Sequence, residues 1–148
     1  MICKGLFYHF SMKHILAPIF LLVFLFPSLA TGEEVTFDDL VIREGVWYKQ
    51  FTDAPFTGNI TGRNQGRFKN GVMEGPWVSY HDNGQLESKG TYKDGKKDGP
   101  WVGYYDNGQL QFKGTLKDGK EDGSWESYDK NGQSDEFAGT YKNGVKVD

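Results

Sequence analysis

Paired aspartates are the side chains of this sequence whose spacing best suits metal binding or acid–base chemistry. Asp94 and Asp98 recur 24 residues later as Asp118 and Asp122. In Asp118-x-Lys120-x-Asp122 a lysine holds the third position, where an EF-hand loop needs an oxygen ligand. Asp-Gly is also the dipeptide that tight turns favour. We therefore assign these aspartates to turns and predict no metal site.

His81 is the next candidate, as a general base. It has no nucleophile motif nearby, and the residues 24 and 48 positions later are Tyr105 and Asp129. The position thus accepts unrelated side chains, and we predict a surface strand residue. No glycine-rich phosphate loop precedes a helical pattern. We predict no catalytic residue and no cofactor-binding residue, and we expect the protein not to be an enzyme.

The elements that carry these residues repeat every 24 positions, as in repeat architectures, which usually build an extended surface. The repeated structural positions are Trp77, Trp101 and Trp125; Gly90 and Gly114; Asn83-Gly84, Asn107-Gly108 and Asn131-Gly132. Aromatic and β-branched runs alternate with Asn-Gly and Asp-Gly pairs, which predicts strands and tight turns. The predicted fold class is all-β: tandem β-hairpin repeats that form an extended, twisted antiparallel meander sheet.

The register of each hairpin follows from its turn. Asn-Gly is typical of a two-residue type I′ turn, which has positive φ at both central residues. With Asn83-Gly84 as that turn, Trp77 lies opposite Gly90, and one repeat later Trp101 lies opposite Gly114. We expect each indole to cover the glycine opposite it, an arrangement known as aromatic rescue.

Alternation along a strand then divides the residues between two faces. One face holds the tryptophans and is predicted to be the apolar one; its other members are Leu86, Tyr92, Gly103, Tyr105, Leu110, Phe112 and Leu116. The opposite face mixes polar and aromatic residues: Tyr80, Glu87, Lys89, Thr91, Val102, Tyr104, Gln111, Lys113 and Thr115.

The two ends of the repeat array depart from the pattern. Upstream, Val46-Trp47-Tyr48 and Phe56-Thr57-Gly58 are expected to form a divergent capping hairpin, because terminal repeats are commonly atypical. Downstream, one extra residue within 134–138 predicts a β-bulge or a longer loop. We place the repeat domain at residues 45–148 and an N-terminal lead-in at residues 31–44.

Residues 1–30 have the composition of a secretory signal peptide. An apolar run from Ile15 follows Lys13 and ends in Ser28-Leu29-Ala30. The run is shorter than the roughly 20 residues of a spanning helix, and it contains prolines. We expect cleavage near Ala30, no stable membrane anchor afterwards, and a secreted or periplasmic protein. Met12 opens a compact signal of its own and is an alternative start.

The cysteine content and net charge exclude some kinds of chemistry and some classes of binding partner. Cys3 is the only cysteine, so the mature chain would have no disulfide or thiolate chemistry. Loss of Lys4 and Lys13 with the signal would change the formal net charge from −3 to −5. An acidic chain with interspersed signs gives no electrostatic reason to expect nucleic acid as a partner. The sequence leaves the oligomeric state open.

The pattern Tyr92-x-x-Gly95-Lys96-x-Asp98-Gly99-x-Trp101-x-x-Tyr104-x-x-Asn107-Gly108-x-Leu110 resembles the MORN repeat, and more closely its bacterial variant. The resemblance covers about residues 45–148. It implies a MORN-like β-hairpin sheet and a protein- or lipid-contacting platform. The bacterial variant is often labelled an antitoxin component of toxin–antitoxin systems, which fits a secretion signal poorly.

The expected function is that of a non-enzymatic platform that binds another protein or an envelope component. The expected contact residues lie on the face without tryptophans, namely Tyr80, Tyr104, Tyr128, Lys89 and Lys113. The alternatives are a cell-wall or glycan-binding module and an antitoxin-like component. The tryptophans are expected to serve the sheet itself.

Overall fold

The computed structural model describes residues 34–148. The predicted signal peptide and the alternative start at Met12 lie outside the described residues. No helix within 34–148 is long and apolar enough to cross a membrane. Residues 34–148 belong to one compact unit.

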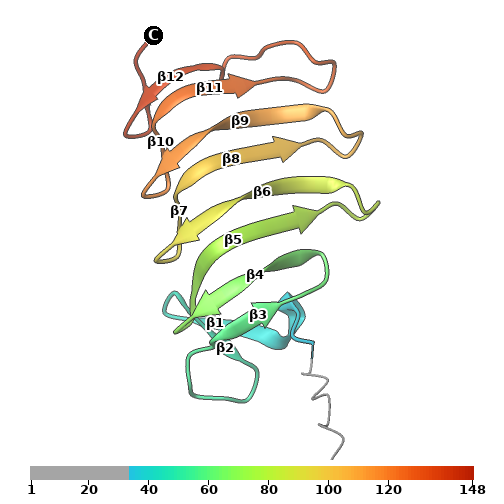
Figure 1. The fold of residues 1–148 in the computed structure, drawn as a ribbon, viewed down its shortest axis with the longest axis vertical. Coiled ribbons are helices and arrows are strands. Elements are labelled where there is room, and N and C mark those ends of the chain that lie inside the picture. The colour runs from blue at the N-terminus through green and yellow to red at the C-terminus, as the bar shows by residue number, and fades with distance from the viewer. Residues whose placement is uncertain (1–33) are drawn as a thin grey trace, which may run out of the picture. The chain divides into compact units, whose positions relative to one another are not determined.

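The described chain is almost entirely β-structure, which confirms the predicted fold class. A short 3₁₀ turn, η1 (Phe37–Asp39), is followed by strands whose bounds are β1 Leu40–Arg43, β2 Val46–Lys49, β3 Gly58–Ile60, β4 Asn64–Lys69, β5 Val72–Tyr80, β6 Leu86–Lys93, β7 Lys96–Lys97, β8 Gly99–Tyr104, β9 Leu110–Lys117, β10 Lys120–Glu121, β11 Gly123–Ser127, β12 Gly139–Lys142 and β13 Val145–Lys146. The main sheet runs from β3 to β13 in chain order, with β7 and β10 paired to the sides of β6 and β9 (Figure 1). It is an antiparallel meander of hairpins.

The predicted register is confirmed along the stem of each hairpin. Trp77 pairs with Gly90 between β5 and β6, and Trp101 pairs with Gly114 between β8 and β9. The last hairpin pairs Trp125 with Gly139, one residue later than a strict 24-residue period would give. The extra residue lies in the segment between β11 and β12, so it forms a longer loop.

The turn assignment is wrong, although the register is right. Gly84 has a φ of 80°, but Asn83 is not among the non-glycine residues with positive φ. Gly84 N–H donates to the carbonyl of His81, and His81 N–H donates to that of Gln85. These bonds close a three-residue loop with a left-handed glycine, typical of a type I turn and G1 bulge. The same bonds recur at Gly108 and Gly132.

A second irregularity restores the register. The longer loop pairs Tyr80 with Leu86, one residue out of phase, and a bulge next to that pair returns the stem to its predicted phase. Tyr104 and Leu110 repeat the arrangement. Directly paired residues share a face. Leu86 and Leu110 therefore lie beside the tyrosines rather than on the tryptophan face where the sequence placed them.

Two-residue type I′ turns occur at the opposite end of the hairpins. Asp94-Gly95 and Asp118-Gly119 have φ values of 49°, 77°, 51° and 83°, the pair of positive angles that this turn requires. This confirms the turn assignment for Asp94 and Asp118, whereas Asp98 and Asp122 lie in the one-residue breaks between β7 and β8 and between β10 and β11. Asn70-Gly71 and Asn143-Gly144 are the corresponding turns at the two ends of the sheet.

The tryptophans cover glycines, but not the ones expected. A Cβ on Gly90 would overlap the indole of Trp101, and one on Gly114 would overlap that of Trp125. Each strand has two neighbours, and the indole leans onto the preceding strand rather than onto its hairpin partner. Trp101 Nε1 fixes this direction, because it donates to the Thr91 carbonyl at 3.1 Å.

Trp77 shows the same lean without the hydrogen bond. Its indole covers Gly66 on β4, but its buried Nε1 has no partner among residues 34–148. The β4–β5 register shifts between Gln65 and Arg67. The same two-residue offset occurs in the later units, because the pairs Lys89–Val102 and Tyr92–Lys97 flank Gly90. The pairs Lys113–Glu126 and Leu116–Glu121 flank Gly114 in the same way, so the offset is a feature of the repeat.

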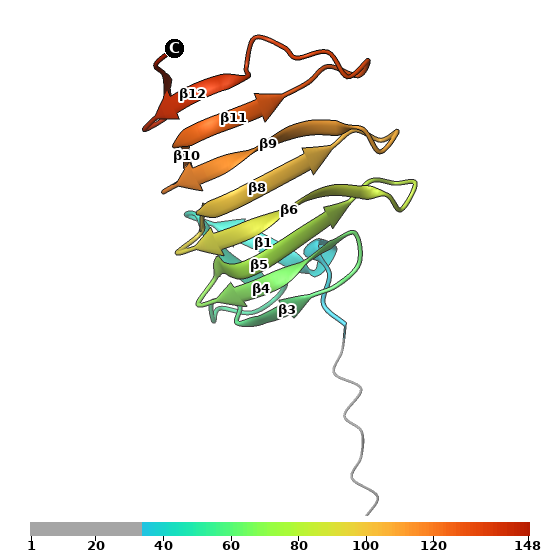
Figure 2. The ribbon, with the colours of Figure 1, turned by 45° about the horizontal axis from the view of Figure 1, so that its top comes forward.

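The N-terminal segment forms a second layer, and the expected capping hairpin is reduced to the bridge between Tyr48 and Pro55 and the hydrogen bond from Phe56 N–H to the Trp47 carbonyl. β2 pairs with β1, and β3 pairs with β4. The β1–β2 hairpin therefore begins in the predicted lead-in of residues 31–44. It packs against the tryptophan face near β4 and β5, behind the sheet in Figure 2. Phe37 contacts Trp47, Phe68 and Trp77 there, with ring centroids 5.2–6.0 Å apart.

Candidate binding surface

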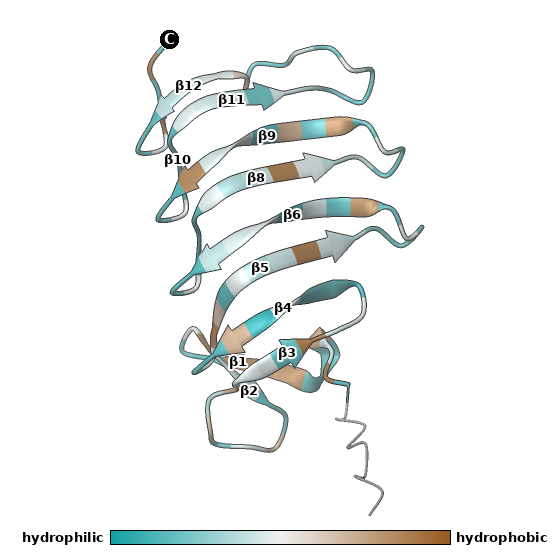
Figure 3. Ribbon diagram, in the orientation of Figure 1, coloured by the Kyte–Doolittle hydropathy of each residue, from teal (hydrophilic) through white to brown (hydrophobic). Residues whose placement is uncertain are grey.

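The sheet presents one face without a second layer, and repeated side chains cross it in rows. We call it the tyrosine face, after Tyr80, Tyr104 and Tyr128. One row alternates valine and lysine: Val78 pairs with Lys89, Lys89 with Val102, and Val102 with Lys113. Lys113 then pairs with Glu126 on β11. In Figure 3 a hydrophobic band recurs at corresponding positions of β5 and β8.

A second row lies two residues along each strand and alternates proline and threonine. Pro76 pairs with Thr91, and Pro100 pairs with Thr115. Pro76 lies in the middle of β5 and Pro100 near the start of β8, and the two prolines are 24 residues apart. Pyrrolidine rings and threonine methyl groups give this row apolar area, and the threonine hydroxyls add polar groups.

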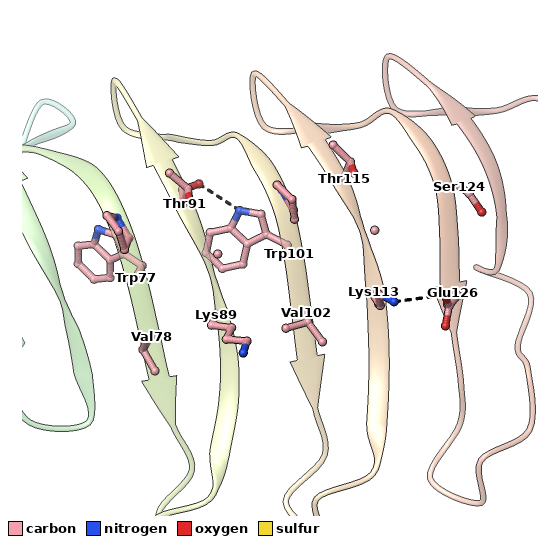
Figure 4. A pocket seen from close by; sticks show the side chains of 14 residues that line it. Trp77, Val78, Lys89, Thr91, Trp101, Val102, Lys113, Thr115, Ser124 and Glu126 are labelled. Atoms are coloured by element: carbon pink, nitrogen blue, oxygen red, sulfur yellow. Dashed lines mark hydrogen bonds and ion pairs between the residues drawn. The ribbon is translucent and has the colours of Figure 1, made fainter.

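The two rows line a groove of about 600 Å³ across β5, β6, β8, β9 and β11 (Figure 4). Its walls hold Val78, Lys89, Thr91, Val102, Lys113 and their row neighbours, and its floor includes the backbone of the covered glycines. Neighbouring strands are about 4.8 Å apart, so each lysine follows the last at roughly 10 Å. The groove therefore presents a lysine ammonium group at a fixed spacing of one repeat.

The two expected contact lysines both line this groove, but the tyrosines do not. Tyr80, Tyr104 and Tyr128 are half-buried and lie one row further along the strands. The Tyr128 hydroxyl donates to Glu126 at 3.3 Å. With Leu86 and Leu110, Tyr80 and Tyr104 form a more apolar strip beside the groove.

Sequence reasoning did not include the valines and prolines that line the groove among the candidate contact residues. The signal was present, since Pro76/Pro100 and Val78/Val102 hold the same period as the tyrosines and alternate onto the same face. Valine is common in any strand, however, and the sequence suggested that each proline opens a strand, where proline is tolerated for structural reasons. Only the absence of a covering layer distinguishes these residues from core residues.

The tryptophan face is closed by its own side chains. Lys97 Nζ lies 4.2 Å from the centroid of the Trp101 ring, a cation–π contact. Burial lowers the pKa of the Lys97 ammonium, while the charge of Glu87 acts in the opposite direction. Burial also raises the pKa of the Tyr92 hydroxyl, whose ring contacts both Trp77 and Trp101.

The loops bearing Asn83, Asn107 and Asn131 link successive repeats. His81 Nε2 lies 2.9 Å from the Tyr104 carbonyl, so this nitrogen carries the proton and donates. Its counterpart Tyr105 donates its hydroxyl to the Tyr128 carbonyl at 2.8 Å. Asn83 Nδ2 donates to the Asp106 carbonyl at 2.7 Å. His81 thus joins neighbouring hairpins, which is a structural task.

The carboxylates at the other hairpin ends also serve the backbone. Glu74 accepts the N–H of Asp94 at 3.0 Å, and Asp98 accepts that of Asp118 at 3.3 Å. Within residues 34–148 no three histidine, cysteine, aspartate or glutamate side chains are grouped to hold a metal ion.

Fold and surface together define a tandem β-hairpin repeat protein with one uncovered face. Residues 73–94 and 97–118 each match the family model described as MORN repeat variant. The first match covers the β5–β6 hairpin apart from Val72, and the second contains β8 and β9. No curated protein sequence matches the chain. The two matched hairpins are those that supply most of the groove.

Proposed function

We propose that this protein is a non-enzymatic platform that binds another protein through the groove of the tyrosine face. MORN repeats are commonly protein- or membrane-interaction modules, with which a repeat platform is compatible. The observation that carries the proposal is the groove of about 600 Å³, lined by the same residue types in successive repeats. Repeated contacts over several strands suit an extended partner better than a small molecule.

The residue types of the groove support protein recognition. Valine and proline supply apolar area at little cost in side-chain entropy, and lysine and threonine supply polar contacts around it. Tyr80 and Tyr104 extend the apolar area beside the groove with Leu86 and Leu110. Tyrosine is enriched at protein interfaces because its ring is large and its hydroxyl polar.

Site-specific photo-crosslinking tests the platform. A photoreactive residue at Val102, in the groove, is expected to give one discrete adduct in native cells. The same residue at Asp118, in an exposed turn, serves as the control and is expected to give none. Equal adducts from both positions, or no adduct from Val102, would contradict a platform at the groove.

The alternative function is that of a glycan-binding module, and a pull-down on peptidoglycan tests it. Retention on peptidoglycan that disappears in Tyr104→Ala, with crosslinking at Val102 unaffected, would move the binding site to the tyrosines. An antitoxin-like role would require the Val102 adduct to contain a toxin that acts outside the cytoplasm.

We further propose that the platform works after secretion or export, a location supported by the composition of residues 1–30. The measurement is the mass of the mature protein from the envelope or medium. The expected mass corresponds to a chain that begins at Thr31. An intact N-terminus in the cytoplasmic fraction would contradict this proposal.

A further inference from the structure

Lys89 and Lys113 occupy equivalent positions of the groove but differ in their electrostatic environment. Lys113 Nζ lies 3.8 Å from a carboxylate oxygen of Glu126, its neighbour on β11. Lys89 has Val102 as the corresponding neighbour on β8. Glu87, two residues from Lys89, acts on Lys97 instead. Among the described residues no carboxylate pairs with Lys89.

Glu126 places a carboxylate beside a lysine in the groove. It replaces the valine of the two preceding repeats, since Val78, Val102 and Glu126 are each 24 residues apart. Its carboxylate therefore lies within the groove, beside a lysine, at the end of the valine–lysine row. The unpaired lysine one repeat earlier offers the same contact to a carboxylate from another molecule.

The groove's width selects the conformation of its ligand. Its lining spans two side-chain rows, and rows two residues apart along a strand are separated by roughly 6.6 Å. An α-helix with side chains is about 10–12 Å across, wider than the two rows. A single extended chain is narrower and can lie between the proline–threonine row and the valine–lysine row.

The spacing of the lysines selects among extended chains. Lys89 and Lys113 are two strands apart, at roughly 10 Å. In a β-strand, residues three apart face opposite sides, so they cannot both reach these lysines. A polyproline II helix has three residues per turn and rises about 3.1 Å per residue, so every third side chain returns to one face after about 9.3 Å. Its pitch thus matches one repeat of this sheet.

We propose, on the basis of the proposed function, that the groove binds an acidic segment of a partner protein in the polyproline II conformation. A carboxylate on every third residue pairs with Lys89 and competes with Glu126 for Lys113. The intervening residues pack on Val78, Val102 and Pro100. Because the protein is acidic overall, the two groove lysines form a local positive site that an acidic segment can recognise.

Synthetic peptides test this inference on the mature protein by isothermal titration calorimetry. Four Glu-Pro-Pro repeats present carboxylates in phase with the lysines, and three Glu-Pro-Pro-Pro repeats present them out of phase at equal length. The in-phase peptide is expected to bind about tenfold more tightly. Four Gln-Pro-Pro repeats show how much of the affinity needs the charge. Equal affinity for both acidic peptides, or no binding of either, would overturn the inference.

Matched variants locate the site. Lys89→Glu with Lys113→Glu is expected to abolish binding of the Glu-Pro-Pro peptide and to permit a Lys-Pro-Pro peptide. Lys93→Glu with Lys117→Glu alters the same strands and face outside the groove and should leave affinity within about twofold. Equal losses in both double variants would overturn the placement.

Glu126→Gln gives a result that a structural role would not produce. Removal of this carboxylate frees Lys113, so affinity for the Glu-Pro-Pro peptide is expected to rise severalfold. An unchanged or lower affinity, with an unchanged melting temperature, would contradict the competition between Glu126 and the ligand.

A membrane of anionic lipids is the other negatively charged ligand that the two lysines could bind. Vesicle flotation with the same variants distinguishes it from an acidic peptide. Flotation with phosphatidylglycerol vesicles that depends on Lys89 and Lys113, without preference between the peptides, would replace the inference. A Val102 crosslink to a partner whose captured segment lacks acidic residues would overturn the inference and leave the platform. Binding of the in-phase peptide without any Val102 crosslink in cells would instead contradict the platform.

Discussion

Phe68 and Tyr141 hold equivalent positions of the repeat at the two ends of the sheet, yet their environments differ. Phe68 is fully buried, with Phe37, Trp47, Phe56 and Trp77 around its ring. Tyr141 is half-buried and has one ring contact, to Trp125 at 6.5 Å. The difference comes from the β1–β2 layer, which covers only the first repeats.

The contrast shows that a repeat position does not set burial by itself. The N-terminal end has a two-layer core, whereas the C-terminal end relies on side chains of a single sheet. At the latter end Phe137 and Val145 are each 64% exposed. Stability in repeat proteins is approximately a sum of local terms. We therefore expect a gradient of stability from the first repeat to the last.

The largest expected effect tests this gradient directly. Phe68→Ala removes a fully buried ring and should cost about 3–5 kcal/mol of unfolding free energy. Tyr141→Ala, at the equivalent position, should cost about 1 kcal/mol because its ring is partly solvated. Urea denaturation of both variants measures the difference. Equal costs would show that the second layer contributes little.

Substitution of the covered glycines by valine is expected to cause the next largest loss of stability. Gly90→Val should displace the buried Trp101 and cost about 2–3 kcal/mol, whereas Gly114→Val should displace the more exposed Trp125 and cost about 1–2 kcal/mol. A double-mutant cycle identifies the tryptophan involved. Gly114→Val should couple to Trp125→Phe and not to Trp101→Phe. Coupling to Trp101 would restore the expectation drawn from the sequence.

The turn glycines Gly71 and Gly144 allow a third comparison of stability between the two ends of the sheet. A Cβ on Gly71 would overlap Val46 of the second layer, whereas one on Gly144 would lie 3.5 Å from Lys120. Both glycines have positive φ, so alanine strains either turn by about 1 kcal/mol. Gly71→Ala should cost about 1 kcal/mol more, as measured by melting temperature. Identical shifts would mean that Val46 moves aside freely.

The smallest effect is a pH dependence at Asp129, near the C-terminal end. Hydrogen bonds from the Gln133 and Asn131 N–H groups lower the pKa of the Asp129 carboxyl from its ordinary 3.8. Because the folded pKa is depressed, the stabilisation exists above the ordinary pKa and is lost as pH falls through the folded one. Asp129→Asn should thus lower the melting temperature at neutral pH. A difference that persists after the pH has fallen well below 3.8 would exclude the charge as its cause.

Much of the sheet could be predicted from the sequence, because a strict period and side-chain alternation constrain register strongly. Trp101 opposite Gly114 followed from counting alone. The turn type did not, because Asn-Gly fits both a type I′ turn and a three-residue loop with a left-handed glycine. The loop and the compensating bulge shift the register in opposite directions. Their effects cancel in the stem and remain visible only at Leu86 and Leu110.

The candidate groove was predictable only in part. Lys89 and Lys113 were assigned to the correct face, but the tyrosines were preferred as contacts and lie outside the groove. A sequence shows which residues alternate onto a face, but it does not show which rows of that face form a hollow. That depends on the relative heights of neighbouring side chains, here proline, valine and threonine.

The sequence alone determined an all-β repeat whose two faces differ in composition, because the tryptophans, glycines and turns recur at one period. The tertiary structure decided which of its two neighbouring strands each tryptophan covers, since a central strand offers a choice that pairing arithmetic cannot make. It also decided which end has a core. Residues outside the period supply that second layer, and their position depends on contacts distant in the sequence.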